Sequence, residues 1–172
     1  MTITTAFTTS DGISNYNVSY NFKQVITPRE LTIKLDTTKV YDGLQFVSTL
    51  SNAGNGQHNG YTISGLQNGA KASGVVTSSA KDVATYTGNG TTGTSTITTA
   101  FTTNDGISNY NVSYDFKQVI TKRDLLITIN DSKEYDGTPL VTDYTEATAT
   151  GLQNGATLDA GVVTTPSKDV AV

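Results

Sequence analysis

The sequence predicts an all-β protein built from tandem small domains, and three observations support this prediction. Threonine, a β-branched residue that suits strands, accounts for 32 of the 172 residues. Asn-Gly, a pair that suits tight hairpin turns, recurs along the chain. Residues 2–36 are nearly repeated by residues 96–130, at an offset of 94 residues (96 − 2 = 94). A repeat of this length indicates an array of similar units.

The first predicted strand shows strict alternation of apolar and polar residues. Tyr16, Val18, Tyr20 and Phe22 alternate with polar residues, and residues 110–117 repeat the pattern. A period of two predicts a half-buried strand whose apolar side chains enter a core. Aromatic rows of this kind can also stack on sugars, but the strict alternation favours the core interpretation.

A second strand follows each copy of the first. Leu31, Ile33 and Leu35 alternate with polar residues, and residues 125–129 hold the same pattern one repeat later. Asp-Gly at 42–43 and again one repeat later predicts a turn. Further strands are expected near residues 61–64, 74–78, 82–87 and 95–103. About seven short strands per unit suggest a small β-sandwich-like domain, with a β-grasp-like domain as the alternative.

The two copies differ in length after the Asp-Gly turn. Residues 44–64 of the first copy correspond to residues 138–150 of the second, which is eight residues shorter (21 − 13 = 8). A length change of this size is typical of a surface loop, so residues 44–64 are expected to be one.

Composition excludes several classes of function. The absence of cysteine excludes disulfides and thiolate metal sites. A net charge of −4 without a basic patch argues against nucleic-acid binding. No apolar run approaches the ~20 residues of a membrane helix, so no membrane insertion is expected. Residues 1–9 lack the features of an export signal, which we expect elsewhere in a longer parent protein.

Residues able to carry catalysis are scarce, so we expect no enzyme, catalytic site, cofactor site or metal site. His58 is the single histidine and lies in a Gly/Asn-rich segment without a partner for acid–base work. Asp42 and Asp136 could act as a carboxylate pair, but an aspartate that caps its own turn is the favoured interpretation.

Two weaker patterns suggest a calcium site and a covalent crosslink, and neither is complete in both copies. Residues 10–12 and 104–106 resemble the start of calcium loops but lack the remaining oxygen ligands. Lys34 and Asn111 could form an isopeptide crosslink if they face each other across strands. Thr128 replaces Lys34 in the second copy, so that crosslink cannot recur there.

The order of several short motifs resembles the YDG/MBG-type repeats of large bacterial surface adhesins. The motifs are Ile-Thr-Lys-Arg-x-Leu-x-Ile at 120–127, Lys-x-Tyr-Asp-Gly at 133–137, Gly-Leu-Gln-Asn-Gly at 151–155, Lys-Asp-Val at 168–170 and Asn-Tyr-x-Val-x-Tyr at 109–114. The resemblance covers nearly the whole chain. It implies secreted, tandemly arrayed β-domains on a cell surface that act as stalks or in adhesion, and it implies no catalytic site.

In the frame of that family, the chain contains one complete unit and two partial ones. Residues 26–120 are expected to form a complete repeat domain, residues 1–25 the last strands of a preceding repeat, and residues 121–172 the first part of a following repeat. In a different frame, the units are residues 1–94 and 95–172, and no strand is exchanged.

We therefore expect a structural module of a bacterial surface adhesin or fibre, located outside the cell on its surface or wall. The partial repeats predict self-association head to tail, with Tyr16, Val18, Tyr20 and Phe22 as an inter-chain strand. Completion within one chain remains an alternative to completion between chains. The alternative function is binding of a host glycan or protein, with a binding patch in residues 44–64.

Overall fold

The computed structural model describes residues 2–169 and consists mainly of β-strands. Three short 3-10 helices accompany the strands: η1 (Ile13–Asn15), η2 (Ile107–Asn109) and η3 (Tyr144–Glu146). The strands are β1 (Arg29–Val40), β2 (Val47–Ala53), β3 (Gly56–His58), β4 (Tyr61–Ser64), β5 (Ala72–Ser78), β6 (Ala84–Gly88), β7 (Ser95–Thr103), β8 (Tyr110–Thr121), β9 (Leu126–Ile129), β10 (Val141–Asp143), β11 (Ala147–Thr150) and β12 (Val162–Thr164). The all-β prediction is confirmed.

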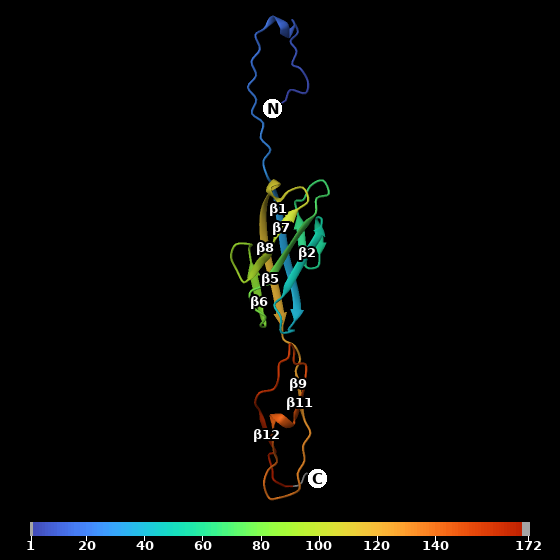
Figure 1. Cartoon of the computed structure of the whole chain (residues 1–172), viewed down its shortest axis with the longest axis vertical. Helices are drawn as coiled ribbons and strands as arrows, with labels where there is room; N and C mark the ends of the chain where they lie inside the picture. Colours follow the sequence, from blue (N-terminus) through green and yellow to red (C-terminus); the bar gives the residue numbers. More distant parts are fainter. Residues whose placement is uncertain (1, 170–172) are drawn as a thin grey trace.

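Strands β1 to β8 form a sandwich of two sheets, which we call the central unit (Figure 1). The sheets have the orders β3-β4-β1-β8-β6 and β2-β5-β7. Phe101 of the smaller sheet stacks on Phe116 of the larger one, with ring centroids 6.1 Å apart, and meets the edge of Tyr61 at 6.2 Å. Because apolar side chains of both sheets share one core, the central unit is a sandwich and not a β-grasp domain.

The strands β1 and β8 lie side by side and run parallel over twelve residues, from Arg29 beside Tyr110 to Val40 beside Thr121. Both strands alternate, and their inward side chains, such as Leu31 on β1, are buried. Since β1 is the first strand of the central unit and β8 the last, their parallel pairing means that the chain enters this unit at one end and leaves it at the other. A division of the chain after residue 94 would cut both sheets, since β7 pairs with β5 and β8 pairs with β1.

The prediction that residues 44–64 form a surface loop was wrong. This segment contains β2, β3 and all of β4, and it buries Leu50, Tyr61 and Ile63 in the core. It brings the central unit to eight strands, one more than expected. The eight-residue difference between the copies falls at the edge strand β3, where the second copy has the short helix η3. Loss of an edge strand leaves the rest of a sheet paired, so the fold tolerates it.

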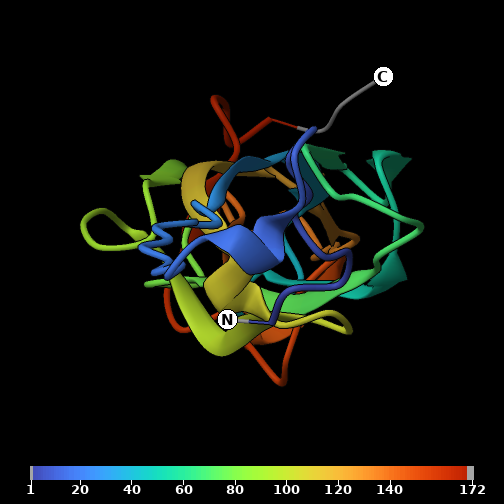
Figure 2. The same cartoon turned by 90° about the horizontal axis from the view of Figure 1, so that it is seen from above.

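Residues 2–28, the N-terminal segment, contain η1 but no strand (Figures 1 and 2). The half-buried strand predicted over Tyr16–Phe22 is therefore absent from the isolated chain. Its alternation is intact, but no strand of the described residues lies beside it. A strand needs a neighbour to pair its backbone N–H and C=O groups, and sequence alternation alone does not supply one.

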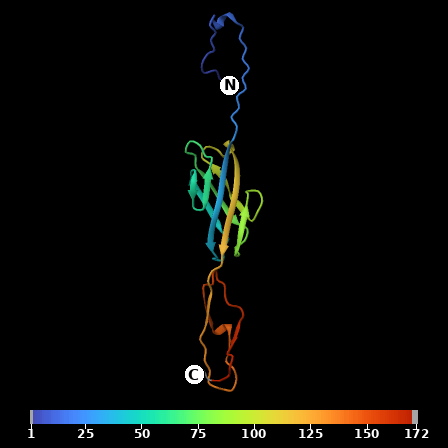
Figure 3. The same ribbon diagram turned by 180° about the vertical axis from the view of Figure 1, so that it is seen from behind.

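Residues 122–169, the C-terminal segment, lie at the opposite end of the central unit (Figure 3). They form two separate two-stranded sheets, β9 with β11 and β10 with β12. Their apolar side chains are largely exposed, including Leu125, Ile127 and Val163. The C-terminal segment thus has strands without a closed core.

Candidate assembly site

The same sequence is buried in the central unit and exposed in the N-terminal segment. Phe116 is 1% exposed, whereas Phe22, its counterpart 94 residues earlier, is 39% exposed. Ile120 is 1% exposed, whereas Ile26 is 99% exposed. Contiguous exposed apolar residues of this kind mark a surface for association. The site residues predicted from sequence, Tyr16, Val18, Tyr20 and Phe22, all belong to this surface.

The N-terminal segment keeps the local contacts that its copy makes in the central unit. The Tyr16 hydroxyl donates to the Asp11 carboxylate, as the Tyr110 hydroxyl donates to Asp105 at 2.7 Å. In both copies this contact lowers the pKa of the aspartate and raises the pKa of the tyrosine. The segment is therefore partly preorganised for the conformation that residues 95–121 adopt.

The aromatic side chains of the N-terminal segment also keep their arrangement. Phe7 and Phe22 stack with centroids 6.0 Å apart, and Tyr20 lies 5.5 Å from Phe22. The corresponding distances in the central unit are 6.1 Å between Phe101 and Phe116 and 5.4 Å between Tyr114 and Phe116. In the central unit this aromatic cluster belongs to the core between the two sheets. In the N-terminal segment the corresponding side chains are exposed to solvent.

The C-terminal segment repeats the strand pairing of the central unit without a change of register. In the first sheet, Ile127 pairs with Ala149 as Ile33 pairs with Ile63. In the second sheet, Thr142 pairs with Val163 as Ser48 pairs with Val76. Strands β9, β10, β11 and β12 therefore correspond to β1, β2, β4 and β5.

The Asp-Gly turns of the two copies also match. Asp42 accepts hydrogen bonds from the Leu44 amide at 3.0 Å and from Lys39 Nζ at 2.7 Å. Asp136 accepts from the Thr138 amide at 2.9 Å and from Lys133 Nζ at 2.8 Å. The lysine and the turn amide lower the pKa of both carboxyl groups. Asp42 and Asp136 thus cap their own turns, as predicted.

Strand β9 has one neighbour where β1 has two. Strand β1 pairs with β4 on one side and β8 on the other, whereas β9 pairs with β11 alone among the described residues. In the other sheet, β5 pairs with β2 and β7, whereas β12 pairs with β10 alone over the same range. In the described part of the C-terminal segment, the edges of β9 and β12 that correspond to the edges of β1 and β5 paired with β8 and β7 are thus unpaired. Unpaired edges are templates for adding a strand from another chain.

Gln118 is a contributor to the sandwich that sequence reasoning missed. Its side chain is fully buried between the sheets and donates to Phe46 O at 2.9 Å and Ser48 Oγ at 2.8 Å. It also accepts from Ser95 Oγ at 3.0 Å. The sequence signal for this role was that Gln118 is a polar residue at a position where the alternation of the strand places side chains toward the core. Gln24 has the same place in the N-terminal segment.

The acceptor side of the site was also missed. Leu125, Ile127 and Val163 are exposed, although their counterparts Leu31, Ile33 and Val76 have no exposed surface. The internal repeat was the available signal. The offset of 94 gives the counterparts of Leu125 and Ile127, and the shared Gly-Val-Val at 161–163 and 74–76 gives that of Val163.

The other candidates from the sequence do not come together into a site. Lys34 pairs with Asp115 at 3.9 Å, whereas Asn111 donates to Glu30, four residues away along β1, at 3.1 Å. Four residues of strand span about 13 Å, so Lys34 and Asn111 do not face each other as a crosslink requires. His58 Nε2 contacts Gly54 O within the β3 hairpin at 3.0 Å. Within residues 2–169, no three His, Asp or Glu side chains are grouped to hold a metal ion.

A scan against protein-family models and searches of curated proteins and of solved structures found no match for this chain. Among the described residues, no helix combines the length and apolar character needed to cross a lipid bilayer. Function is therefore inferred from the geometry of the N-terminal and C-terminal segments.

Proposed function

We propose that the chain is a structural module that assembles head to tail, with the N-terminal segment of one chain completing the C-terminal segment of another. The observation that carries this proposal is the contrast in burial between the two copies of one sequence. Residues 95–121 are built into both sheets of the central unit, and their copy in residues 2–27 makes the same local contacts without any sheet. The strands missing beside β9 and β12 are the counterparts of β8 and β7.

The internal repeat gives the register of the exchanged strands. Since Ile33 pairs in parallel with Tyr114, Ile127 of one chain is expected beside Tyr20 of the next. Since Val76 pairs antiparallel with Ile97, Val163 is expected beside Ile3. One N-terminal segment would thus add a strand to each sheet, giving the orders β11-β9-donor and β10-β12-donor. These orders reproduce β4-β1-β8 and β2-β5-β7 of the central unit.

The geometry of β1 favours exchange between chains over closure within one chain. Its twelve residues span about 40 Å, and Arg29 lies at the end where the N-terminal segment enters. The acceptor strand begins past the other end, after Thr121. In the register above, Thr27 would lie beside Glu134, yet Thr27 is tethered to Arg29 by a two-residue step of about 7 Å. Closure within one chain would therefore require β1 to leave its sheet.

The outward-facing side chains are compatible with this pairing. In the central unit, Lys34 of β1 is paired with Asp115 of β8 at 3.9 Å. Their counterparts are Thr128 and Asn21, so both members of the pair are neutral. The exchanged strand would leave no unpaired charge at this position. Exposed ion pairs contribute little stability, so this match bears on compatibility and not on affinity.

Such a contact is heterologous, because the surface used by one chain differs from the surface used by its partner. Heterologous contacts extend into filaments unless the rotation closes a ring. Each added chain would contribute its own central unit and one composite unit. We therefore propose a stalk or fibre of stiff β-domains. The likeness of its motifs to bacterial surface repeats supports a location outside the cell.

Disulfide formation tests the register directly, because the chain contains no cysteine. Chains carrying Asn21→Cys are mixed with chains carrying Thr128→Cys and oxidised. Their counterparts, Asp115 and Lys34, are neighbours on the exposed face of the larger sheet, at a spacing that a disulfide can bridge. We expect a covalent dimer in the mixture and none in either variant alone.

The matched control replaces Thr128→Cys by Ser132→Cys, four residues or about 13 Å further along the acceptor, beyond disulfide reach. Equal crosslinking of Asn21→Cys with both acceptor positions would contradict the register. Absence of any dimer at high concentration would contradict the exchange itself.

A further inference from the structure

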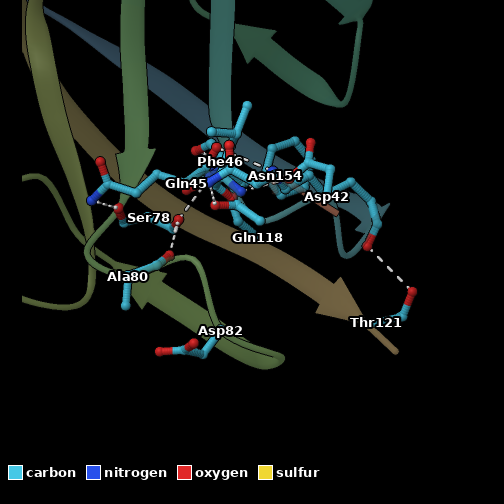
Figure 4. Close-up of polar contacts among 12 residues, drawn as sticks. Asp42, Gln45, Phe46, Ser78, Ala80, Asp82, Gln118, Thr121 and Asn154 are labelled. Atoms are coloured by element: carbon cyan, nitrogen blue, oxygen red, sulfur yellow. Dashed lines mark hydrogen bonds and ion pairs between the residues drawn. The ribbon is translucent and has the colours of Figure 1, made fainter. Parts of the chain in front are cut away.

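The joint between the central unit and the C-terminal segment is a close contact between two turns. Asn154 lies beside the turn that holds Asp42 and Gly43 (Figure 4), and its side-chain amide donates to Gly43 O at 3.4 Å. A Cβ atom at Gly43 would lie 2.6 Å from the Cβ of Asn154, closer than side chains pack. Gly43 is buried there. The glycine of the Tyr-Asp-Gly turn is therefore needed where Asn154 approaches.

Local structure holds Asn154 in place. It has a positive φ of 54° in the turn Gly-Leu-Gln-Asn-Gly, a conformation that asparagine tolerates better than most residues. Gly151, at the start of this turn, packs so closely on Asp124 O that an added Cβ would lie 2.2 Å from that oxygen. The turn is therefore fixed against the residues that precede β9, which themselves leave the central unit at Thr121.

The asparagine and the glycine of this contact each have a counterpart in the other copy of the repeat. These counterparts, Asn68 and Gly137, are far apart within one chain. Asn68 has a φ of 49° in the same turn of the central unit, and Gly65 packs on Glu30 O at the same 2.2 Å. Gly137 has a φ of 80°, close to the 78° of Gly43, but a Cβ there would meet no atom of residues 2–169 within 4 Å. Asn68 lies in the central unit at the end where the N-terminal segment enters, and Gly137 lies in the C-terminal segment beyond the other end. Asn68 is exposed.

We infer that Gly137 of one chain receives Asn68 of the next chain, as Gly43 receives Asn154 within a chain. This inference rests on the proposed head-to-tail exchange and adds a second, separate contact surface to it. The composite unit would end in the Asp136-Gly137 turn where the central unit of the next chain begins. Every joint along the assembly would then contain the same pair of turns, and the angle between successive units would be alike at joints within and between chains.

Crosslinking between the turns tests this inference separately from strand exchange. Chains carrying Asn68→Cys are mixed with chains carrying Gly137→Cys and oxidised, beside the Asn21→Cys and Thr128→Cys mixture. Because added side chains at Gly43 and Asn154 would begin only 2.6 Å apart, closer than the Cβ spacing of a disulfide, the reference for reach is one chain carrying Gly43→Cys with Asn154→Cys. The control for position is Asn59→Cys, another exposed asparagine with a φ of 49° before a glycine, located in the β3–β4 turn. We expect covalent dimers from residues 68 and 137 and none from residues 59 and 137.

The two crosslinks separate the possible failures. If the reference pair 43 and 154 crosslinks, dimers from residues 21 and 128 without dimers from residues 68 and 137 would overturn the joint contact and leave strand exchange standing. Absence of both crosslinks would overturn the exchange, and the joint contact with it.

A second variant avoids placing a side chain at Gly137, where positive φ strains other residues. Asn68→Gly keeps the turn and removes only the contacting side chain. We expect it to raise the concentration needed for assembly about threefold to tenfold, the effect of losing one modest hydrogen-bonded contact. The matched variant Asn59→Gly should leave that concentration unchanged. Equal behaviour of the two variants would overturn the inference.

Discussion

A chain carrying both Tyr20→Asp and Phe22→Asp should remain monomeric at concentrations where the unaltered chain assembles. In the proposed exchange these two side chains enter the composite core, as Tyr114 and Phe116 pack in the core of the central unit. Loss of two buried aromatic side chains removes about 3–6 kcal/mol of hydrophobic stabilisation, and burial of a carboxylate adds a further cost. The dissociation constant for assembly should therefore rise by about 100-fold to 10,000-fold or more. Sedimentation velocity measures this change.

The control for this variant adds the same charge to the opposite face of the donor strand. Ser19→Asp with Asn21→Asp places two carboxylates at outward positions, and Asn21→Asp reproduces the aspartate that Asp115 supplies in the central unit. This control should still assemble, with a change of less than tenfold. If inward and outward variants assembled equally well, the alternating face of residues 16–22 would not be the contact surface.

The second large effect is a difference in unfolding free energy between Phe116→Ala and Phe22→Ala, substitutions at equivalent positions of the two copies. Phe116→Ala should destabilise the central unit by about 3–5 kcal/mol, because it leaves a cavity beneath Phe101 and Tyr114. Phe22→Ala should change the unfolding free energy of the dilute monomer by less than about 0.5 kcal/mol, since Phe22 is 39% exposed and lies outside the core of the central unit. Urea unfolding followed by tyrosine fluorescence measures both.

The same two variants should behave differently in assembly. Phe22→Ala should raise the concentration needed for assembly, whereas Phe116→Ala should mainly lower the unfolding midpoint. Equal destabilisation of the dilute monomer by both substitutions would mean that Phe22 is already buried within its own chain, which contradicts exchange between chains.

The sequence predicted those parts of the fold that depend on local pattern. Alternation located β1 and β8, and the Asp-Gly pairs located the capped turns at Asp42 and Asp136. Strand β2 was missed because residues 44–53 do not alternate cleanly. Strand β3 was missed because it begins with Gly56 and lies between Asn55 and Asn59, residue types common in loops. The parallel neighbour of β1 was also beyond reach, because a period of two identifies a buried face and not the strand beside it.

The candidate assembly site could not be predicted from the local sequence alone. The segments around Phe22 and Phe116 have nearly the same local sequence, so no local pattern distinguishes the exposed copy from the buried one. The difference arises from distant strands: β1 and β5 flank residues 95–121 within the chain, and none flanks residues 2–27 among the described residues. The repeat offset predicted the partial units, but the identity of the acceptor edges required the observed pairing.

The mass of the unaltered chain as a function of concentration tests head-to-tail exchange most directly. Size-exclusion chromatography with light scattering measures it, and electron microscopy shows the shape of the particles. Head-to-tail exchange predicts masses that grow with concentration in steps of the 18.1 kDa chain, and rods or rings built from β-domains about 40 Å long. A particle of 18.1 kDa at every concentration, with residues 16–22 protected from proteolysis, would contradict it.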